Sequence, residues 1–420
     1  MIEETTTMAE KTAQELYAER KKRIEDAVAL REPDRVPFYY ASRFWAASLA
    51  GLTFKEFMYD ADKAIEATRK AVRMLDPDAF SAAVYAFGHA LETLDFKPMR
   101  WPGHGADVNA TFQYIDKEFM SAKEYDDYLR DPTSFTLRQF LPRIAGALEG
   151  LTLFPDIATR TEWDIITCLR AFADPKLQAS IEAMIRAGVQ VNDTQSKIGA
   201  FARSMIEEGF TIAAGGFCKS PFDHLLDSLR GSKGGMLDMF RNRDKLMAAI
   251  ERAEALIVRS VAEGAKAVGC PYIFMPLHWG LDGFMSQDQF KTFYWPPLRR
   301  IMMYLIERDC VPCVLWEGNC STRLEHIADI PRGKAVYWFE ATDMVRAKDV
   351  LGDIVCLRGN VPASLLNTGT PDDVDAYCKN LIKKVGKGGG FMLDGAASIP
   401  DEAKVENVLA MANSVKKYAN

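Results

Sequence analysis

The sequence lacks a surplus of positive charge and any long hydrophobic run. Lys and Arg total 52 against 58 Asp and Glu, a net charge of −6. This balance gives no electrostatic attraction to nucleic acid or to an anionic membrane surface. No run of 18 or more apolar residues occurs, so no membrane-spanning helix is expected. The sequence therefore predicts neither a nucleic-acid partner nor a membrane partner.

Features of a secreted protein are also missing. The opening MIEETTTMAEKTAQELYAERKKR is polar and has no apolar segment typical of a secretory signal. The eight cysteines are scattered, and the Cys310–Cys313 pair with CxxC spacing has no second pair beside it. This usage fits reduced thiols rather than a disulfide framework. We therefore expect a cytoplasmic protein.

What the chain does contain is enough apolar material for a large core. Of its 420 residues, 48% are apolar and 26% are charged, which is ordinary globular composition. The length suits two or three domains or one α/β barrel. We find no internal repeat, low-complexity tract or linker.

Short apolar runs alternate with amphipathic, helix-like stretches along the chain. Helical patterns cover Asp244–Val268 and Asp288–Arg308, and Thr370 followed by Pro371 predicts a helix start. Strands that alternate with helices favour parallel βαβ units, and eight runs predict a (β/α)₈ TIM-type barrel. We expect an N-terminal helical segment at 1–34 and a barrel at 35–420, with a helical and loop-like insertion at about 95–205. The predicted strands are Arg35–Tyr40, Ala79–Tyr85, Phe210–Gly216, Tyr272–Leu277, Val311–Trp316, Ala335–Phe339, Ile354–Leu357 and Gly390–Leu393.

Polar side chains interrupt the apolar runs where the predicted strands end, the place where barrels of this type collect their chemistry. A carboxylate at the end of a buried strand must be paired, bound to a ligand or protonated. For Glu317 an ion pair with Arg323 or Arg358 is the structural alternative, and Asp394 could simply shape a turn with Gly395. Asn360 could instead hydrogen-bond the loop that it begins. The strand-end candidates are Cys218, Lys219, His278, Glu317, Glu340, Asn360 and Asp394.

Several segments resemble the uroporphyrinogen decarboxylase superfamily, in the same order along nearly the whole chain. RIEDAVALREPDRVPF (23–38) is similar to the first helix and strand of that family. The other similar segments are GGFCKSPFDHLLDSLRG (215–231), RGNVPASLL (358–366) and the C-terminal IPDEAKVENVLAMANSVKKY. The resemblance implies a (β/α)₈ barrel with N-terminal helices.

Within this superfamily, the porphyrinogen decarboxylases carry an arginine-rich opening segment that holds substrate carboxylates. Here the stretch YYASRFWAASLAG retains only Arg43. A tetrapyrrole with many carboxylates needs several guanidinium groups. The stretch instead predicts an apolar or aromatic binding site, which disfavours the decarboxylase. The predicted substrate-binding residues are Tyr39, Tyr40, Arg43, Phe44, Trp45, Trp101 and Asn360.

The other branch of the superfamily contains methyltransferases that work with a corrinoid protein. Many of them hold zinc with a His-x-Cys pair and a later Cys, whereas this chain has WEGNC (316–320) and LDGAAS (393–398) there. We predict one divalent metal, with zinc as the first candidate, His278 and Glu317 as its best ligands, and Glu340 and Asp394 as candidates for the rest. It could polarise an ether oxygen of a methoxylated aromatic donor, with Glu317 and His278 as the catalytic residues.

The chain lacks the Asp-x-His-x-x-Gly motif of the usual corrinoid-binding domain, so a separate protein would carry the corrinoid. The resemblance also implies a possible homodimer. The donor's identity and the direction of methyl transfer stay open. Two alternatives also stay open: a decarboxylase acting on porphyrinogens or another carboxylated substrate, and a noncatalytic barrel that binds a ligand or a corrinoid protein.

Overall fold

The computed structural model describes residues 11–158, 160–258 and 261–419. The first ten residues of the predicted N-terminal segment 1–34 lie outside the described residues, as do residues 259–260 of the predicted helix Asp244–Val268 and residue 159 of the predicted insertion.

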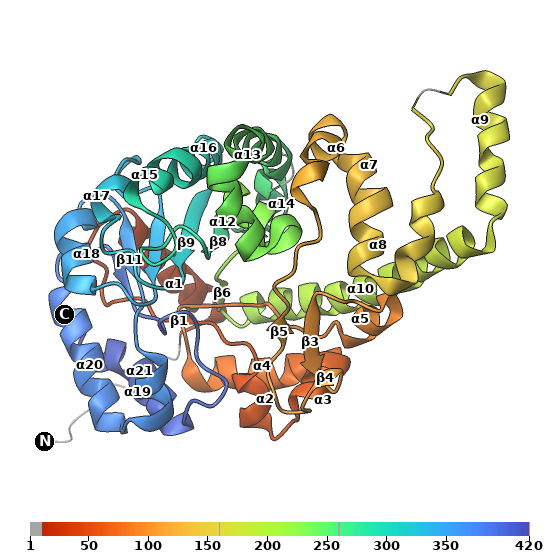
Figure 1. Ribbon diagram of the computed structural model, residues 1–420. Helices are drawn as coiled ribbons and strands as arrows, with labels where there is room; N and C mark the ends of the chain where they lie inside the picture. Colours follow the sequence, from red (N-terminus) through yellow and green to blue (C-terminus); the bar gives the residue numbers. More distant parts are fainter. Residues whose placement is uncertain (1–10, 159, 259–260, 420) are drawn as a thin grey trace, which may run out of the picture.

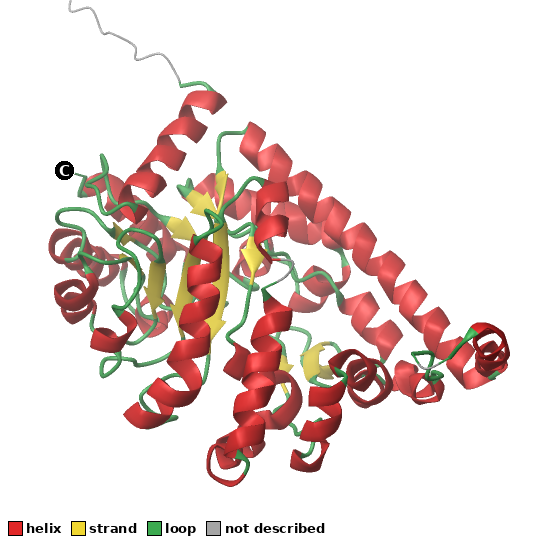
Figure 2. Ribbon diagram, turned by 90° about the horizontal axis from the view of Figure 1, so that it is seen from above, coloured by secondary structure: helices red, strands yellow, loops and turns green. Residues whose placement is uncertain are grey.

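The protein has a mixed α/β fold in which parallel strands are covered by helices (Figures 1 and 2). One parallel sheet has the order β1-β2-β6, and the other has the order β12-β11-β10-β9-β8-β7. Their strands are β1 (Tyr39–Tyr40), β2 (Ala79–Phe80), β6 (Thr211–Ile212), β7 (Gly216–Phe217), β8 (Tyr272–Leu277), β9 (Val311–Trp316), β10 (Val336–Phe339), β11 (Cys356–Arg358) and β12 (Phe391–Met392).

Two connections join these sheets to each other. Phe38, next to β1, forms a parallel bridge with Leu393, next to β12. At the other side, β6 and β7 belong to one stretch of chain, and β6 pairs with β2 whereas β7 pairs with β8. The parallel pairings therefore run in a continuous cycle through both sheets.

Helices follow most of the strands, as an alternating pattern requires. The helices of the first half are α1 (Ala13–Val28), α2 (Trp45–Ala50), α3 (Phe54–Tyr59), α4 (Ala61–Leu75), α5 (Gly88–Leu94), α6 (Tyr125–Arg130), α7 (Pro132–Phe135), α8 (Leu141–Ile144), α9 (Glu162–Cys168) and α10 (Pro175–Glu207). Those of the second half are α11 (Pro221–His224), α12 (Gly231–Arg241), α13 (Arg243–Ile257), α14 (Val261–Val268), α15 (Gln287–Gln289), α16 (Trp295–Ile306), α17 (Leu324–Ile327), α18 (Met344–Leu351), α19 (Ala363–Thr368), α20 (Pro371–Lys384) and α21 (Val405–Lys417).

The helix α1 closes one end of the parallel strands. Its Ile24, Ala27 and Val28 are buried in one apolar cluster with side chains of β1, β2, β9, β10, β11 and β12. Arg23 of α1 pairs with the fully buried Asp78 at 2.5 Å, and Arg35 pairs with the other oxygen of the same carboxylate at 2.6 Å. Apolar packing and a buried ion pair therefore both hold α1 against the ends of the strands.

Most of the predicted elements are confirmed. The bounds of β8 and β9 agree with the sequence prediction. The predicted strand Phe210–Gly216 is instead two short strands, β6 and β7, and the other predicted strands are shorter, with β11 ending one residue later than predicted. Thr370 accepts a hydrogen bond from the backbone of Asp373 and caps α20. The predicted helix Asp288–Arg308 contains a π-helical turn at Phe290–Tyr294 before α16.

The segment predicted as a helical and loop-like insertion also contains three short strands. These are β3 (Met99–Pro102), β4 (Gly105–Ala106) and β5 (Gln113–Tyr114), which form a small sheet of their own. All eight cysteines are free thiols, in agreement with the prediction. Among the described helices, none has the length and apolar character needed to cross a membrane.

Candidate active site

Three predicted site residues meet at one level, just beyond the ends of β8, β9 and β10. Leu277 pairs with Trp316, which pairs with Phe339, and all three are fully buried. Side chains alternate between the two faces of a strand, so the next residue on each strand points to the opposite face. Those residues are His278, Glu317 and Glu340, each only partly buried. The strand register therefore places an imidazole and two carboxylates side by side.

His278 is held between two carboxylates. Its Nδ1 lies 2.8 Å from Asp227 Oδ2, and its Nε2 lies 3.5 Å from Glu317 Oε1. Asp227 belongs to the π-helical turn Leu225–Arg230 that follows α11. It also accepts hydrogen bonds from Lys219 Nζ at 2.7 Å and from Trp279 Nε1 at 2.7 Å. Asp227 therefore orients the imidazole and leaves Nε2 facing Glu317.

The two carboxylates keep His278 positively charged. Burial by itself lowers the pKa of His278, but the contacts with Asp227 and Glu317 outweigh it and raise the pKa to about 10. Burial likewise tends to raise the pKa of Asp227, but the contacts with His278 and Lys219 lower it to about 2. The site therefore contains an imidazolium and a carboxylate at neutral pH.

A second aspartate fixes the backbone of the loop that carries His278. The backbone N–H groups of His278 and Trp279 both donate to Asp223 Oδ1, at 3.2 and 3.0 Å. The other oxygen of Asp223 accepts from Ser220 Oγ at 2.7 Å and from Tyr294 Oη at 2.6 Å. Asp223 is fully buried, and this burial raises its pKa to about 6.

Glu317 sits where the chain turns sharply. Gly318 has a φ of 119°, and a Cβ there would lie 2.8 Å from Leu281 Cδ1, so this turn requires glycine. The structural alternative that pairs Glu317 with Arg323 or Arg358 is wrong. Arg323 lies 3.4 Å from Asp282, and Arg358 bonds Asp394.

Glu340 lies close enough to Glu317 for their charges to interact. Burial, and then the negative charge of Glu317, raise the pKa of Glu340. Two neighbouring carboxylates favour a shared proton or a bound cation. Glu340 is therefore a second polar group that faces the same space as His278.

Asp394 is engaged elsewhere. Its Oδ2 accepts from Arg358 Nε at 2.8 Å and from Nη2 at 2.6 Å, and its Oδ1 accepts from the N–H of Gly395 at 2.7 Å. Both side chains are buried, and the guanidinium stacks over the rings of Tyr39 and Trp338 at 4.3 and 3.9 Å. Asp394 is therefore an ion-pair residue inside the strand layer in this structure.

The donor set gives an incomplete fit to a zinc ion. His278 Nε2 and Glu317 Oε1 face each other at a distance that two ligands of one metal could span. However, Asp394 is bonded to Arg358, and in the described part of the chain no group of three or more His, Cys, Asp or Glu side chains is placed to hold a metal. A catalytic zinc centre normally has three protein ligands. The residues as placed do not supply that set.

Asn360 bonds protein groups, but in another loop than the one that it begins. Its Nδ2 donates to the carbonyl of Thr342 at 3.1 Å and to that of Glu340 at 3.3 Å, and its Oδ1 accepts from Tyr377 Oη at 3.1 Å. Asn360 therefore fixes the loop that follows Glu340.

The predicted aromatic binding cluster is packed in the interior. Tyr39, Tyr40, Phe44 and Trp45 are each at most 2% exposed. Trp45 Nε1 donates to the carbonyl of Ala403, and Phe44 stacks on Phe54 with centroids 4.7 Å apart. In this structure these four rings therefore act as packing residues.

Trp101 is also fully buried. It stacks on His104 with ring centroids 4.0 Å apart, and its Nε1 donates to Tyr59 Oη at 3.0 Å. Both the ring face and the N–H of Trp101 therefore already contact other side chains of the protein.

Arg43, in contrast, is exposed and lies beside other aromatic residues. Its guanidinium is 5.5 Å from the ring centroid of Phe112, which contacts the rings of Tyr85 and Tyr114. Burial raises the pKa of Tyr85. The positive charge of Arg43 lowers that pKa, and the negative charge of Glu317 raises it slightly further. Arg43, Phe112, Tyr85 and Tyr114 thus form a second group of aromatic and cationic side chains.

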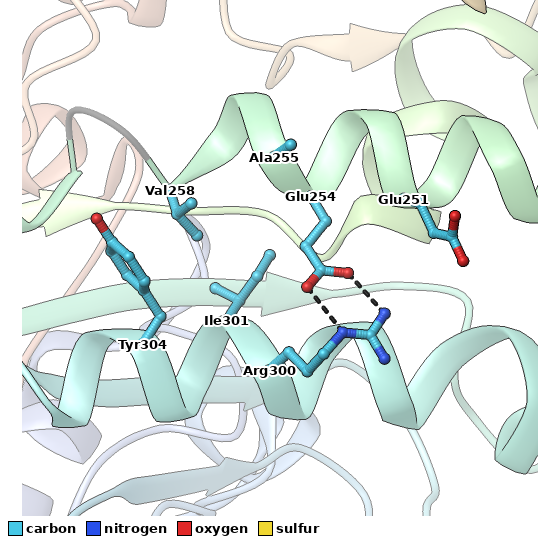
Figure 3. A pocket seen from close by; sticks show the side chains of 7 residues that line it. All are labelled: Glu251, Glu254, Ala255, Val258, Arg300, Ile301 and Tyr304. Atoms are coloured by element: carbon cyan, nitrogen blue, oxygen red, sulfur yellow. Dashed lines mark hydrogen bonds and ion pairs between the residues drawn. The ribbon is translucent and has the colours of Figure 1, made fainter.

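A surface hollow between α13 and α16 contains none of the predicted site residues (Figure 3). Its charged centre is a two-point ion pair, in which Arg300 Nε and Nη2 donate to the two oxygens of Glu254 at 2.8 and 2.7 Å. The two charges compensate each other there, so the site at the strand ends is the better candidate for catalysis.

The sequence analysis missed Asp223 and Asp227 as members of the site. The two aspartates are spaced i, i+4 in the apolar stretch PFDHLLDSLR, directly after the Ser220 cap. Such spacing places both on one face of a helix. The i, i+4 spacing could have identified the two aspartates as a pair. No pattern in the sequence, however, tells which strand end that helix face contacts.

Comparison with known proteins agrees with this architecture. The family model for uroporphyrinogen decarboxylase (URO-D) matches residues 181–418, which is more than half of the chain. A solved structure of a methyltransferase from Methanosarcina mazei is similar with a TM-score of 0.62 at 15% sequence identity, and the match covers 96% of this chain and 99% of that one. At this identity the similarity concerns the fold.

Among curated proteins, uroporphyrinogen decarboxylases are similar over limited stretches. That of Chlorobium phaeovibrioides is 30% identical over 104 residues, 24% of this chain and 29% of its own length. That of Coxiella burnetii is 23% identical over 185 residues, 43% of this chain and 50% of its own length. The chain thus matches half or less of the length of these relatives. Given the extent of the family match, the chain belongs to the uroporphyrinogen decarboxylase family.

Proposed function

We propose that this chain is a methyltransferase that moves a methyl group between a small methylated donor and the corrinoid of a separate protein. The observation that carries the proposal is the Asp227–His278–Glu317 contact chain, which holds a charged, partly exposed imidazole just beyond the ends of β8 and β9. The fold similarity to a protein described as a methyltransferase supports the reaction class.

The imidazolium suits the departure of a phenolate from a methoxylated aromatic. Despite burial, the contacts with Asp227 and Glu317 raise the pKa of His278. The imidazole therefore carries a proton on Nε2 that a general acid can give to a leaving oxygen. In the demethylation direction, His278 Nε2 donates its proton to the oxygen that loses the methyl group. That oxygen keeps the electron pair of the broken bond.

The corrinoid of the partner would supply the cobalt that accepts the methyl group. This chain supplies a rim on which a flat, apolar ring system could rest. Phe217, the last residue of β7, is 54% exposed, and Phe284, in the segment that follows β8, is 48% exposed. Trp279 packs edge-to-face on Phe284 with ring centroids 5.1 Å apart. Such exposed aromatic surface is typical of a binding site.

The donor would enter beside Arg43. Phe112 and the 76%-exposed Tyr114 offer aromatic surface there, and the guanidinium offers one positive charge. One guanidinium suits a single carboxylate or phenolate on an aromatic ring. This pattern supports a methoxylated aromatic acid better than a polycarboxylated tetrapyrrole.

Zinc stays a prediction of the sequence, and no step of the proposed reaction is derived through it. His278 Nε2 and Glu317 are the two side chains that would hold it, with Asp227 orienting the imidazole from behind.

We also propose that the cycle of parallel pairings forms a (β/α)₈ barrel. Counting β6 and β7 as one interrupted strand, the pairings join eight strands, and the bridge between Phe38 and Leu393 links the last to the first. The site then lies at the carboxyl ends of the strands, where barrels of this kind hold their active sites.

The test uses free cob(I)alamin as acceptor and a panel of methoxylated benzoates as donors, in the absence of oxygen. We expect loss of the cob(I)alamin absorption with the parent protein and at least a hundredfold slower reaction with His278→Gln, since general acids contribute about 10²–10⁴-fold. Glu325→Gln, on the exposed face of α17, serves as a matched control for Glu317→Gln.

An unchanged rate in both His278→Gln and Glu317→Gln would contradict the proposed site. The same preparations are incubated with uroporphyrinogen. Formation of coproporphyrinogen would favour the decarboxylase alternative, which the names of the curated relatives suggest.

A further inference from the structure

The face of the sheet that carries His278 also carries two aromatic rings that are not fully covered. Side chains alternate along a strand, so Phe274, four positions before His278 on β8, points to the same face as His278. Phe217, the last residue of β7, pairs with Phe274 in the parallel register, and the two ring centroids are 6.1 Å apart. We call Phe217 and Phe274 the ring pair.

The exposure of the ring pair is confined to this face. Phe217 is 54% exposed and Phe274 is partly exposed. Ile273 and Met275, which flank Phe274 on β8 and point to the opposite face, are fully buried in the large apolar cluster. The uncovered surface of Phe274 therefore faces the same side as His278. Aromatic surface beside a few placed polar groups is typical of a small-molecule site.

Trp338 supports the ring pair from β10. Its ring centroid lies 6.2 Å from that of Phe274, and its Nε1 donates to the carbonyl of Gly395 at 2.9 Å. The guanidinium of Arg358 lies 3.9 Å from the centroid of the same indole, which is only 4% exposed. Phe274 therefore rests on a ring that is itself fixed, and a ligand on the ring pair would meet a pre-organised surface.

The polar groups of the candidate site adjoin the ring pair. On β8, Pro276 is the one residue of this face between Phe274 and His278. The other ring is followed two positions later by Lys219, whose Nζ donates to the same oxygen of Asp227 that contacts His278 Nδ1. Two aromatic rings thus lie beside an imidazolium and an ammonium group.

We propose that the ring pair binds the aromatic ring of the methyl donor, with the ether oxygen of the donor towards His278 Nε2. This inference rests on the proposed methyl transfer and adds the place of the ring. A general acid must lie within hydrogen-bond reach of the oxygen that it protonates. Four strand positions span about 13 Å, which is enough for one ring with its methoxy group between Phe274 and His278.

The surroundings select an uncharged group at the reacting end of the donor. Glu317 Oε1 lies 3.5 Å from His278 Nε2, and the charge of Glu317 also acts on Glu340. These carboxylates repel a negative charge placed beside them. The ligand of the ring pair is therefore an aryl methyl ether that carries any carboxylate on the far side of its ring.

The test is the binding of methoxybenzene to the full chain, measured by calorimetry without any corrinoid. Phe274→Leu keeps apolar surface but removes the ring. It should raise the dissociation constant about three- to tenfold, since contact between two aromatic rings contributes this much beyond the burial of their area. The parent should prefer methoxybenzene to the nonaromatic methoxycyclohexane, and this preference should shrink by the same factor in Phe274→Leu.

Phe217→Leu, at the more exposed ring, should act in the same direction. Its place in the rim proposed for the corrinoid does not affect this measurement, because no corrinoid is present. Phe240→Leu is the matched control, since it makes the same change at a ring that is 75% exposed on α12. It should leave both dissociation constants unchanged, and circular dichroism should show the same fold in all variants.

Two results would overturn the inference. One is a parent that does not prefer methoxybenzene, and the other is equal binding by Phe274→Leu, Phe217→Leu and the parent. Weaker binding in Phe112→Leu alone would place the ring beside Arg43 instead. Binding as expected, without demethylation when cob(I)alamin is added, would count against the proposed methyl transfer and leave the ring site standing.

Discussion

At the scale of single residues, the charge on His278 depends on a partner that is distant in sequence. Asp227 contacts Nδ1 at 2.8 Å, and together with Glu317 it outweighs the burial that would otherwise favour the neutral ring. Because the folded-state pKa is raised above the ordinary value of about 6.5, this contact stabilises the fold fully below pH 6.5. The stabilisation is lost as the pH rises through about 10.

Removal of the Asp227 charge should therefore shift the alkaline limb of the pH–rate profile. In the parent, methyl transfer should decline as the pH approaches 10, where His278 loses its proton. In Asp227→Asn the decline should begin at lower pH, and kcat should fall more than KM rises, because the donor's own contacts are untouched. The measurement is kcat and KM against pH, with Asp288→Asn on the exposed α15 as control.

A limb that stays in place in Asp227→Asn would show that Asp227 only packs against the imidazole. Asp227 would then have no role in setting the charge of His278.

At the scale of elements, a buried charge and an apolar face dock α1 against the ends of the strands. Asp78 is fully buried and accepts hydrogen bonds from Arg23, from Arg35 and from the N–H of Phe38 at 2.8 Å. Donors from α1 and from the segment that enters β1 thus meet on one carboxylate. This explains why α1 is held beside β1 and β2 although it precedes both.

Asp78→Ala should destabilise the protein by about 3–5 kcal/mol, because it leaves two guanidinium groups without their buried partner. Denaturant unfolding followed by circular dichroism measures the free energy of unfolding. Glu325→Ala, which removes the exposed pair with Arg346, should change that free energy by at most about 1 kcal/mol. Equal effects of the two substitutions would show that Asp78 contributes no more than a surface pair.

At the scale of the whole molecule, proton transfer from His278 and catalysis by zinc predict different responses to a chelator. Activity should survive removal of metal if His278 supplies the proton, and the zinc content should not correlate with the rate. The measurement is elemental analysis and the cob(I)alamin assay before and after chelation. Loss of activity that is restored by zinc would confirm the sequence prediction of a zinc centre. It would also contradict the role of His278 as an acid.

The sequence by itself determined the strand and helix pattern and three members of the site. Val311–Trp316 and Tyr272–Leu277 are continuous apolar runs with clear ends, so their bounds could be predicted. His278, Glu317 and Glu340 follow such runs directly, and the common register of parallel strands brings them to one level. Strands as short as β4 and β5 contain too few residues to show any period, and were missed.

Only the tertiary structure decided which groups those residues meet. Asp227 and His278 are 51 positions apart in the sequence, and Asp394 pairs with Arg358 rather than with His278. Local sequence patterns do not encode such contacts, because they depend on how helices and neighbouring strands pack in the folded chain. The aromatic residues beside Arg43 were assigned to a binding site because they are neighbours in sequence. Packing instead buried Tyr39, Tyr40, Phe44 and Trp45 and brought Tyr85 and Phe112 to Arg43, since burial depends on which surfaces the whole chain presses together.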